Sequence, residues 1–213
     1  MKTILVLLAG CSAILAQPLS VGVKAGLPLT DFVDTVSSGG GSLTSTTKLY
    51  IVGPTVELRL PAGFGVEFDA LYRRFGYNAS SPLNIVTNVF NIRTTGNDWE
   101  FPLLVKKRFA GEGPIRPFVD IGVNFSKITG LTQTVVSTFR PGATSTGQPA
   151  ELRNDVSTGF VIGVGLDAHI LLHIMPEIRY TRWGMDHFSG AIAPVGSLSS
   201  NRNQAEFLLG ITF

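Results

Sequence analysis

The chain has few charged residues, a single cysteine and no long apolar run. Asp, Glu, Lys and Arg make up 15% of its 213 residues, whereas roughly a quarter is usual in soluble domains. Mean hydropathy is nevertheless positive, at +0.28, and no apolar stretch reaches the ~20 residues that a transmembrane helix needs. Such a chain must either spread its apolar side chains in alternation along strands or bury them in a large core.

Two further scarcities exclude other classes of protein. The only cysteine is Cys11, so the chain forms no internal disulfide bond. The formal net charge is +2, which gives no indication of a nucleic-acid partner. Glycine, in contrast, occurs 24 times, and Thr, Ser and Val are frequent. This composition favours β-strands and loops over helices.

The N-terminus has the pattern of a secretory signal peptide. A short basic start is followed by an apolar run to Ala16, which predicts a cleaved segment at 1–16 and a mature domain at 17–213. Ile14 is the third residue back from a cleavage after Ala16, where a small side chain is preferred. The exact cleavage site therefore stays open. The alternative is a lipobox ending at Cys11, which would lipidate that cysteine. Only ten residues precede it and the apolar run continues beyond it, so ordinary cleavage is favoured.

The last eleven residues, 203–213, alternate between apolar and mostly polar or small side chains. The apolar positions are Ala205, Phe207, Leu209, Ile211 and Phe213. Side chains of a strand alternate between its two faces, so this segment predicts a strand with one apolar face. Its length suits a tilted strand that crosses a bilayer.

Seven other segments show the same alternation. They are residues 19–27, 48–60, 64–77, 99–109, 116–128, 156–168 and 174–183. The connections are long after the first, third, fifth and seventh strands, and short after the second, fourth and sixth. Outer-membrane barrels show this asymmetry between external loops and periplasmic turns. The predicted fold is therefore all-β, an eight-stranded antiparallel up-and-down transmembrane β-barrel with short periplasmic turns and long extracellular loops.

Three local features add detail to this prediction. Pro54 lies inside the second strand, where it has no amide hydrogen for the ladder, so we expect a bulge there. Residues 61–63, Pro-Ala-Gly, predict a tight turn. The polar stretch 78–98 contains scattered apolar residues and is expected to extend its hairpin partly beyond the membrane. The other long connections, rich in Ser, Thr and Gly, are predicted to be loops.

Charged residues gather on the face opposite the apolar one. An eight-stranded barrel is too narrow to hold the apolar face inside, so we expect the charges in the lumen, where pairing makes their burial tolerable. The expected lumen network comprises Lys24, Glu57, Arg59, Glu67, Asp69, Arg73, Glu100, Lys106, Arg108, Asp120, Asp167, Glu177, Arg179 and Glu206, and Arg116 lies on the same face. Inward glycines leave volume for these long side chains.

Aromatic residues fall at both ends of the predicted strands, as expected of interfacial belts. Tyr50, Tyr72 and Trp99 lie towards the long loops, and Phe64, Phe109 and Phe213 towards the short turns. Lys107 lies on the outward face near a turn, where it can extend its ammonium group to periplasmic headgroups.

Strand number, loop asymmetry, lumen charges and the terminal Phe213 together resemble the small eight-stranded outer-membrane barrels of the OmpA and OmpX type. The resemblance covers residues 19–213, and we expect a protein of this type without a periplasmic peptidoglycan-binding domain. It implies location in the bacterial outer membrane, contact with lipid and lipopolysaccharide, and insertion by the barrel-assembly machinery. The residues that carry this assembly signal are Phe207, Leu209, Ile211 and Phe213. We also expect a monomer, with an extracellular loop partner of unknown kind.

Fold alone does not determine function, and three hypotheses are open. The first is a non-enzymatic structural or surface-interaction protein with a lumen closed by paired charges. The second is a small porin-like channel. The third is a lipid-modifying enzyme, a deacylase or acyltransferase, with Asp186, His187 and Ser189 at its rim. We prefer the simpler interpretation that these three residues form a polar rim segment. We likewise interpret His169 and His173 as solvated turn residues. No catalytic site, metal or cofactor is expected.

Overall fold

The protein is described by a computed structural model that covers residues 19–81, 90–109, 114–137, 144–169, 172–192 and 195–213. The predicted signal peptide and Cys11 lie outside these residues. Within them, no helix is long and apolar enough to cross a membrane.

Almost all of the described chain is strand. The elements, in chain order, are β1 (Leu19–Pro28), β2 (Val33–Ser37), β3 (Ser42–Ser45), β4 (Ile51–Arg59), the 3₁₀ turn η1 (Pro61–Gly63), β5 (Phe64–Asp69), β6 (Leu71–Ser80), β7 (Phe90–Arg108), β8 (Ile115–Ser137), β9 (Thr144–Gly147), β10 (Val156–His169), β11 (His173–Trp183), β12 (Ser189–Ile192), β13 (Gly196–Ser200) and β14 (Asn203–Thr212).

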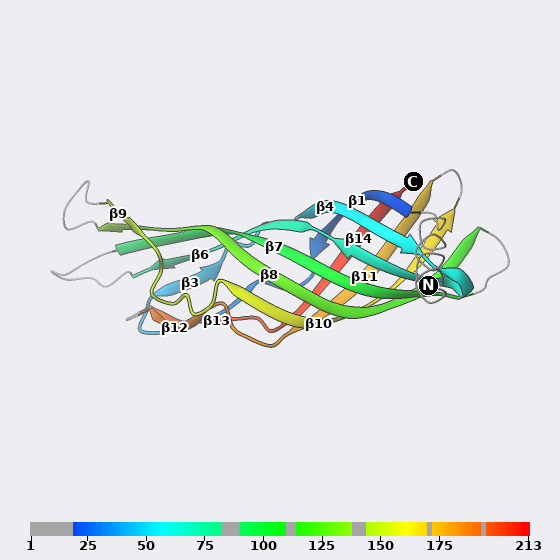
Figure 1. The fold of residues 1–213 in the computed structure, drawn as a ribbon. Helices are drawn as coiled ribbons and strands as arrows, with labels where there is room; N and C mark the ends of the chain where they lie inside the picture. The colour runs from blue at the N-terminus through cyan, green and yellow to red at the C-terminus, as the bar shows by residue number, and fades with distance from the viewer. Residues whose placement is uncertain (1–18, 82–89, 110–113, 138–143, 170–171, 193–194) are drawn as a thin grey trace, which may run out of the picture.

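Eight strands surround one lumen, with β5 and β6 forming a single strand interrupted at Ala70. The order around the barrel is β1, β4, β5 with β6, β7, β8, β10, β11 and β14, and every pairing is antiparallel (Figure 1). The first and last strands join from Gly22 opposite Thr212 to Pro28 opposite Glu206. This seam removes the two free edges that a bilayer would not tolerate. The predicted barrel is therefore confirmed.

The interruption at Ala70 has a local cause in the neighbouring strand. Ala70 N donates to Pro54 O at 3.0 Å, but Pro54 has no amide hydrogen to return the bond. The register continues unchanged on both sides, with Val52 opposite Tyr72 and Thr55 opposite Asp69. The predicted bulge at Pro54 is therefore wrong, because one missing hydrogen bond does not require an extra residue.

The register irregularity lies instead in β7, between Thr95 and Asn97, where this strand pairs with β8. Beyond it, β7 and β8 extend far past the rest of the barrel (Figure 1). The predicted strands, 99–109 and 116–128, were too short. In the extensions polar pairs such as Arg93 opposite Thr134 and Thr95 opposite Thr132 replace the apolar outer face, because a ladder outside the bilayer needs no apolar side chains towards lipid.

The long connections also hold more structure than the predicted loops. Strands β12, β13 and β2 form a second, three-stranded sheet, β3 pairs with β6, and β9 pairs with β8. These segments lie at the end of the barrel opposite the turn η1 and the C-terminus (Figure 1). We call the two ends the loop end and the turn end.

A hydrophobic cluster, which we call the cap, fills the loop end. It combines inward residues of the barrel with residues of the connections: Phe32, Val33, Leu43, Phe75, Tyr77, Ala79, Ile128, Phe188, Ile192, Val195 and Leu198. Phe32 and Phe75 stack with ring centroids 4.2 Å apart. The sequence pattern did not predict this cluster, because its apolar residues are scattered singly or in pairs among Ser, Thr and Gly.

Gly22 tests how tightly the seam is packed. A Cβ atom at this position would lie 2.0 Å from Ile211 O on β14, so Gly22→Ala must push the two strands apart. We expect a loss of roughly 1–3 kcal/mol in unfolding free energy, the usual scale of overpacking. Urea titration of the refolded barrel, followed by the mobility difference between unheated and boiled samples on SDS gels, measures it.

The matched control is Gly147→Ala on β9, where a Cβ atom would meet nothing within 4 Å. Equal stability of the two variants would contradict tight packing at the seam.

Candidate functional site

The lumen gathers charged side chains from the inward positions of the strands. Of the fourteen residues expected there, all except Arg59 are buried. They share this space with buried apolar side chains, among them Leu71, Leu104 and Phe118. The charged side chains form three layers along the barrel axis, which we take from the middle outward.

One carboxylate holds the middle layer together. Glu67 of β5 contacts the ammonium group of Lys24 on β1, that of Lys106 on β7 at 2.5 Å, and Arg179 on β11 at 3.3 Å. Strand β7 is the direct neighbour of β5, β1 is separated from β5 by β4, and β11 lies on the opposite side of the barrel, so the pair with Arg179 spans the lumen. A buried ion is tolerated only when it is paired and hydrogen-bonded, and Glu67 meets that condition with three cations.

Three more carboxylates complete the middle layer. Glu177 lies 2.9 Å from the Lys24 ammonium group and 2.6 Å from Arg179 Nε. Asp69 lies 3.0 Å from Arg179 Nη1 and 3.3 Å from Lys24. Asp120 is the weakest member, since its nearest cation in this layer, Lys106, is 4.0 Å away.

The layer towards the loop end has the opposite composition, with several carboxylates around one cation. Arg73 pairs with Asp98 at 3.0 Å, Glu100 at 2.6 Å and Glu206 at 3.5 Å. Hydrogen bonds from neutral groups share the negative charge: Asn124 donates to Glu100 and Ser126 donates to Asp98, both at 2.5 Å.

Asp98 is a lumen residue that the sequence interpretation missed, because it was assigned to the preceding polar stretch. Its signal was nevertheless present: Asp98 is two positions before the inward Glu100, and residues two apart in a strand share a face. Gln204 was placed on the inward face of the predicted last strand, but it was left out of the network because it is uncharged. It accepts a hydrogen bond from Arg73 at 2.6 Å and lies two positions before Glu206.

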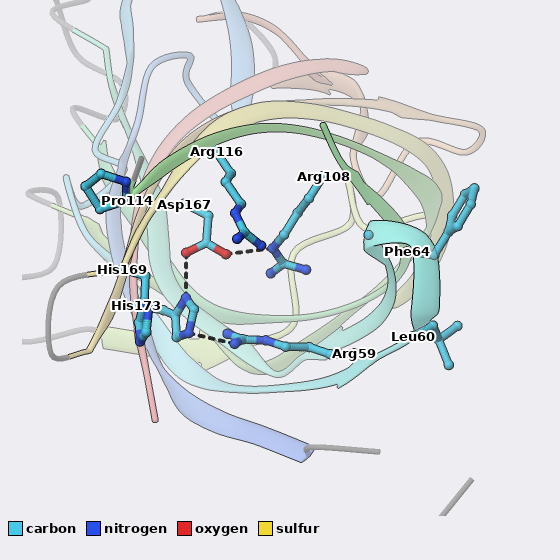
Figure 2. A pocket seen from close by; sticks show the side chains of 10 residues that line it. Arg59, Leu60, Phe64, Arg108, Pro114, Arg116, Asp167, His169 and His173 are labelled. Carbon is cyan, nitrogen blue, oxygen red and sulfur yellow. Dashed lines mark hydrogen bonds and ion pairs between the residues drawn. The ribbon is translucent and has the colours of Figure 1, made fainter. Parts of the chain in front are cut away.

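The turn-end layer opens into a cavity of about 280 Å³, the mouth (Figure 2). A chain of hydrogen bonds crosses it, from Arg59 to His173 Nε2 at 2.6 Å, from His173 Nδ1 to Asp167 at 2.7 Å, and from Arg108 Nε to Asp167 at 2.6 Å. Arg108 also donates to Glu57 at 2.6 Å. Because Arg59 can only donate, His173 Nε2 accepts, which places the imidazole hydrogen on Nδ1, facing Asp167.

Two sequence-based expectations fail at the mouth. His173 is not a solvated turn residue: it begins β11, is only partly exposed, and stacks at 4.3 Å on the exposed His169 at the end of β10. Arg59 is only half-buried and pairs with no described carboxylate. Arg116 does lie on the inward face as expected, but it is exposed because it lines the mouth (Figure 2). Near the turn the inward face widens into the mouth, so strand alternation no longer guarantees burial.

The proposed rim triad does not converge. Asp186 pairs with Arg202 at 2.5 Å, and this hydrogen bond holds the pKa of Asp186 below its usual range. His187 points the other way, with Nδ1 2.8 Å from Asn154 O. Ser189 donates its amide to Glu151 O. His187 is also buried against Phe32, which lowers its pKa, so the interpretation of all three as polar rim residues is wrong for this histidine.

His187 instead meets a serine that the sequence did not single out. Its Nε2 lies 2.9 Å from Ser126 Oγ, a distance that suits a nucleophile and its base. However, the nearby carboxylate of Asp98 contacts the serine and not the imidazole, and both Ser126 and His187 are at most 3% exposed. The pair therefore connects the lumen to the cap. No group of His, Cys, Asp and Glu side chains in the described ranges could hold a metal ion.

The outer wall carries the aromatic rows that the sequence predicted. At the loop end Tyr72 lies between Tyr50 and Trp99, with ring centroids 6.3 and 5.1 Å away. At the turn end the Lys107 ammonium group lies 4.0 Å from the Phe64 ring centroid and donates to Ala62 O at 2.6 Å. Between these rows many large apolar side chains are exposed, among them Phe68, Val119 and Leu209.

A closed barrel with an apolar belt outside and paired charges inside defines the class of outer-membrane β-barrels. The sequence matches the family model of the outer membrane protein beta-barrel domain over residues 15–188. The chain belongs to this family, which locates it in the bacterial outer membrane. The turn end is accordingly periplasmic and the loop end extracellular.

Three solved structures match this chain at low sequence identity, and the first of them shows the same fold. OprG from Pseudomonas aeruginosa matches with a TM-score of 0.54 and 14% identity, over 92% of this chain and 94% of that one. Neisserial surface protein A matches with a TM-score of 0.39 and 12% identity, over 92% and 97%. Ail from Yersinia pestis matches with a TM-score of 0.34 and 10% identity, over 92% and 96%. A comparison with curated proteins found no match.

Removing one lumen cation should deprive several buried carboxylates of one ion-pair partner. Arg179→Met leaves Glu67, Asp69 and Glu177 buried with one partner fewer each, and we expect a loss of roughly 3–5 kcal/mol in unfolding free energy. Urea unfolding of the barrel in lipid vesicles, monitored by tryptophan fluorescence, measures the effect. The control, Arg202→Met, breaks the exposed pair with Asp186 and should change stability far less. A similar small loss in both variants would mean that water already solvates the lumen.

Proposed function

We propose that this protein is a non-enzymatic outer-membrane protein whose ion pairs hold the lumen shut and whose extracellular end serves surface contacts. The observation that carries the proposal is the position of Glu67, which binds cations from three other strands and reaches Arg179 on the opposite side of the barrel. Side chains paired in this way occupy the middle of a lumen that eight strands already make narrow.

The cap supports the same conclusion at the extracellular end. Phe32, Phe75 and Phe188 are each at most 1% exposed, and they pack beside the lumen charges, with the Arg73 guanidinium 4.7 Å from the Phe32 ring centroid. A path for ions would have to cross both this apolar cluster and the charged layers below it.

A small channel is the second candidate, and the periplasmic mouth is the observation that favours it. Its 280 Å³ cavity opens towards the periplasm and is lined by cationic side chains, as an anion entrance could be. Its inner wall, however, includes Arg108, which is held by Glu57 and Asp167. We therefore treat the mouth as a blind vestibule.

The enzyme hypothesis has less support. The Asp186, His187 and Ser189 side chains diverge, and the Ser126–His187 pair is buried between cap and lumen. An acyl-transfer enzyme needs its nucleophile, base and orienting acid in line and open to the substrate. A family of barrel proteins also gives no particular reason to expect catalysis.

Conductance tests the closed lumen. Planar-bilayer recording of the refolded wild-type barrel should show no stable open level. The variant Lys24→Ser, Glu67→Ser, Arg179→Ser removes the bulk and the charge at the centre of the middle layer, and it should show single-channel currents if the barrel still migrates as a folded species. Large, stable currents from the wild-type protein would favour the channel.

The terminal residue tests the proposed contact with the assembly machinery. Phe213 N donates to Val21 O at 3.0 Å, and Phe213 O accepts from Ser20 Oγ at 2.9 Å, while 73% of its surface is exposed. Phe213→Ala keeps the backbone seam and removes the ring. It should refold in detergent like the wild type but yield less folded barrel in cell envelopes.

Deletion of Phe213 also removes the seam bonds and should impair both refolding and assembly. Phe160→Ala, which removes another outward ring, on β10, is the control and should leave both unchanged. If Phe213→Ala assembles normally in cells, the ring is not a recognition signal.

A further inference from the structure

A basic pocket lies on the outer wall of the barrel, on the extracellular side of the aromatic row. We call it the wall pocket. Its cavity has a volume of about 360 Å³, and its lining includes Lys48, Arg74, Arg93, Thr46, Asn78 and Thr95. These residues come from the segment before β4 and from β6 and β7.

Strand register determines where the pocket lies relative to the membrane. On β6 and β7, Tyr72 pairs with Trp99, Arg74 with Asn97, and Asn78 with Arg93. Successive outward rows are two residues apart, or about 7 Å along the strand. Arg74 is therefore one row beyond the aromatic row, and Arg93 is three rows beyond it.

The segment before β4 continues the same rows. Lys48 N donates to Arg74 O at 2.9 Å, and Thr46 N donates to Gly76 O at 2.8 Å, so Lys48 lies beside Arg74. Between the two basic levels stands Gly76, where a Cβ atom would come within 2.9 Å of Thr46 Oγ1. The absence of a side chain there leaves the floor of the pocket open.

The wall pocket has an excess of positive charge that the protein itself does not neutralise. Lys48, Arg74 and Arg93 form no ion pair with any carboxylate that the structure describes. The segments outside the described ranges contain one acidic residue, Glu112, which in the sequence lies between Arg108 and Ile115, the turn-end ends of β7 and β8. Three like charges around one cavity repel one another unless an anion lies between them.

Other extracellular cations differ in this respect, because protein oxygens already hold them. Arg202 binds Asp186, Arg153 donates to Ser189 O, and Arg182 binds Asn203. The periplasmic mouth also differs, since Asp167 and Glu57 neutralise part of its charge. The wall pocket is thus the described cationic cluster with the clearest need for an external anion.

The surroundings determine which anion can reach it. The side chains face outward, just beyond the row of Tyr50, Tyr72 and Trp99, which marks the membrane interface. Lipid headgroups of the outer leaflet therefore lie against this wall. Guanidinium groups bind phosphate oxygens in pairs of hydrogen bonds, and two basic levels separated along the strands suit a tall headgroup with more than one anionic group.

We propose that Lys48, Arg74 and Arg93 bind the phosphate groups of an outer-leaflet glycolipid. The site depends on the barrel's location in the outer membrane and not on whether the lumen is closed, so conductance of the wild-type protein would leave it untouched. Bound at one fixed point, the lipid would orient the barrel and anchor the β6–β7 extension at the membrane surface.

The test uses the refolded full-length mature barrel in detergent, with purified diphosphoryl lipid A as the probe. Binding is measured by native mass spectrometry and by the shift in apparent melting temperature. We expect Arg74→Gln with Arg93→Gln to weaken binding at least tenfold, and the addition of Lys48→Gln to weaken it further. Because these side chains are exposed, the variants should remain heat-modifiable barrels.

Two controls separate specific binding from general attraction to positive charge. Arg153→Gln with Arg202→Gln removes the same charge from the same end of the barrel and should bind lipid A like the wild type. Lipid A stripped of its phosphates should bind the wild-type barrel at least tenfold more weakly.

Three results would overturn the proposal. The control variant could lose as much affinity as the pocket variant. The dephosphorylated lipid could bind as well as the phosphorylated one. Inorganic phosphate could compete at concentrations similar to lipid A, which would point to a soluble anion as the ligand.

Discussion

The structure depends on one electrostatic constraint, which is that an ion buried away from water must have a partner. Glu67 shows how the barrel satisfies it, because this single carboxylate takes cations from β1, β7 and β11. Removing either partner from such a pair costs more than the pair itself contributes. The ion pairs therefore determine the strand register more than they add stability. A lumen charge finds its partner only when its strand is in register, so the network favours one closed arrangement of the barrel.

The lipid imposes a second constraint, and closure joins the two. An apolar outer face requires a sheet without edges, and the seam between β1 and β14 provides it. The same seam brings Lys24 to the carboxylates of other strands. Glycine on the inward face leaves room for the buried carboxylates: at Gly163 on β10, a Cβ atom would lie 2.3 Å from Asp120 Oδ1. The apolar outer face and the charged lumen are thus two consequences of one alternating pattern.

The sequence could predict what alternation controls and little else. Val23 and Lys24 are neighbours with opposite environments, and period-two reasoning places both correctly. Asp98 was missed because the predicted strand began too late. His173 was misassigned because its hydrogen bond to Arg59 joins residues far apart in the chain. The cap could not be foreseen, since Phe32, Phe75 and Phe188 become a core only after three separate segments meet. Local patterns determine faces, whereas caps and hydrogen-bond chains depend on tertiary contacts.

The cap and the charged lumen are joined by direct side-chain contacts. Arg73 stacks on Phe32 while it holds Asp98 and Glu100, and Ser126 links Asp98 to His187, which packs on the same phenylalanine. The connections at the extracellular end are therefore anchored to the barrel interior through both apolar and polar contacts. A surface held in this way needs little ordering when it meets a partner, and lower ordering costs favour binding. The lumen charges would then serve recognition indirectly, by keeping the extracellular surface in one conformation.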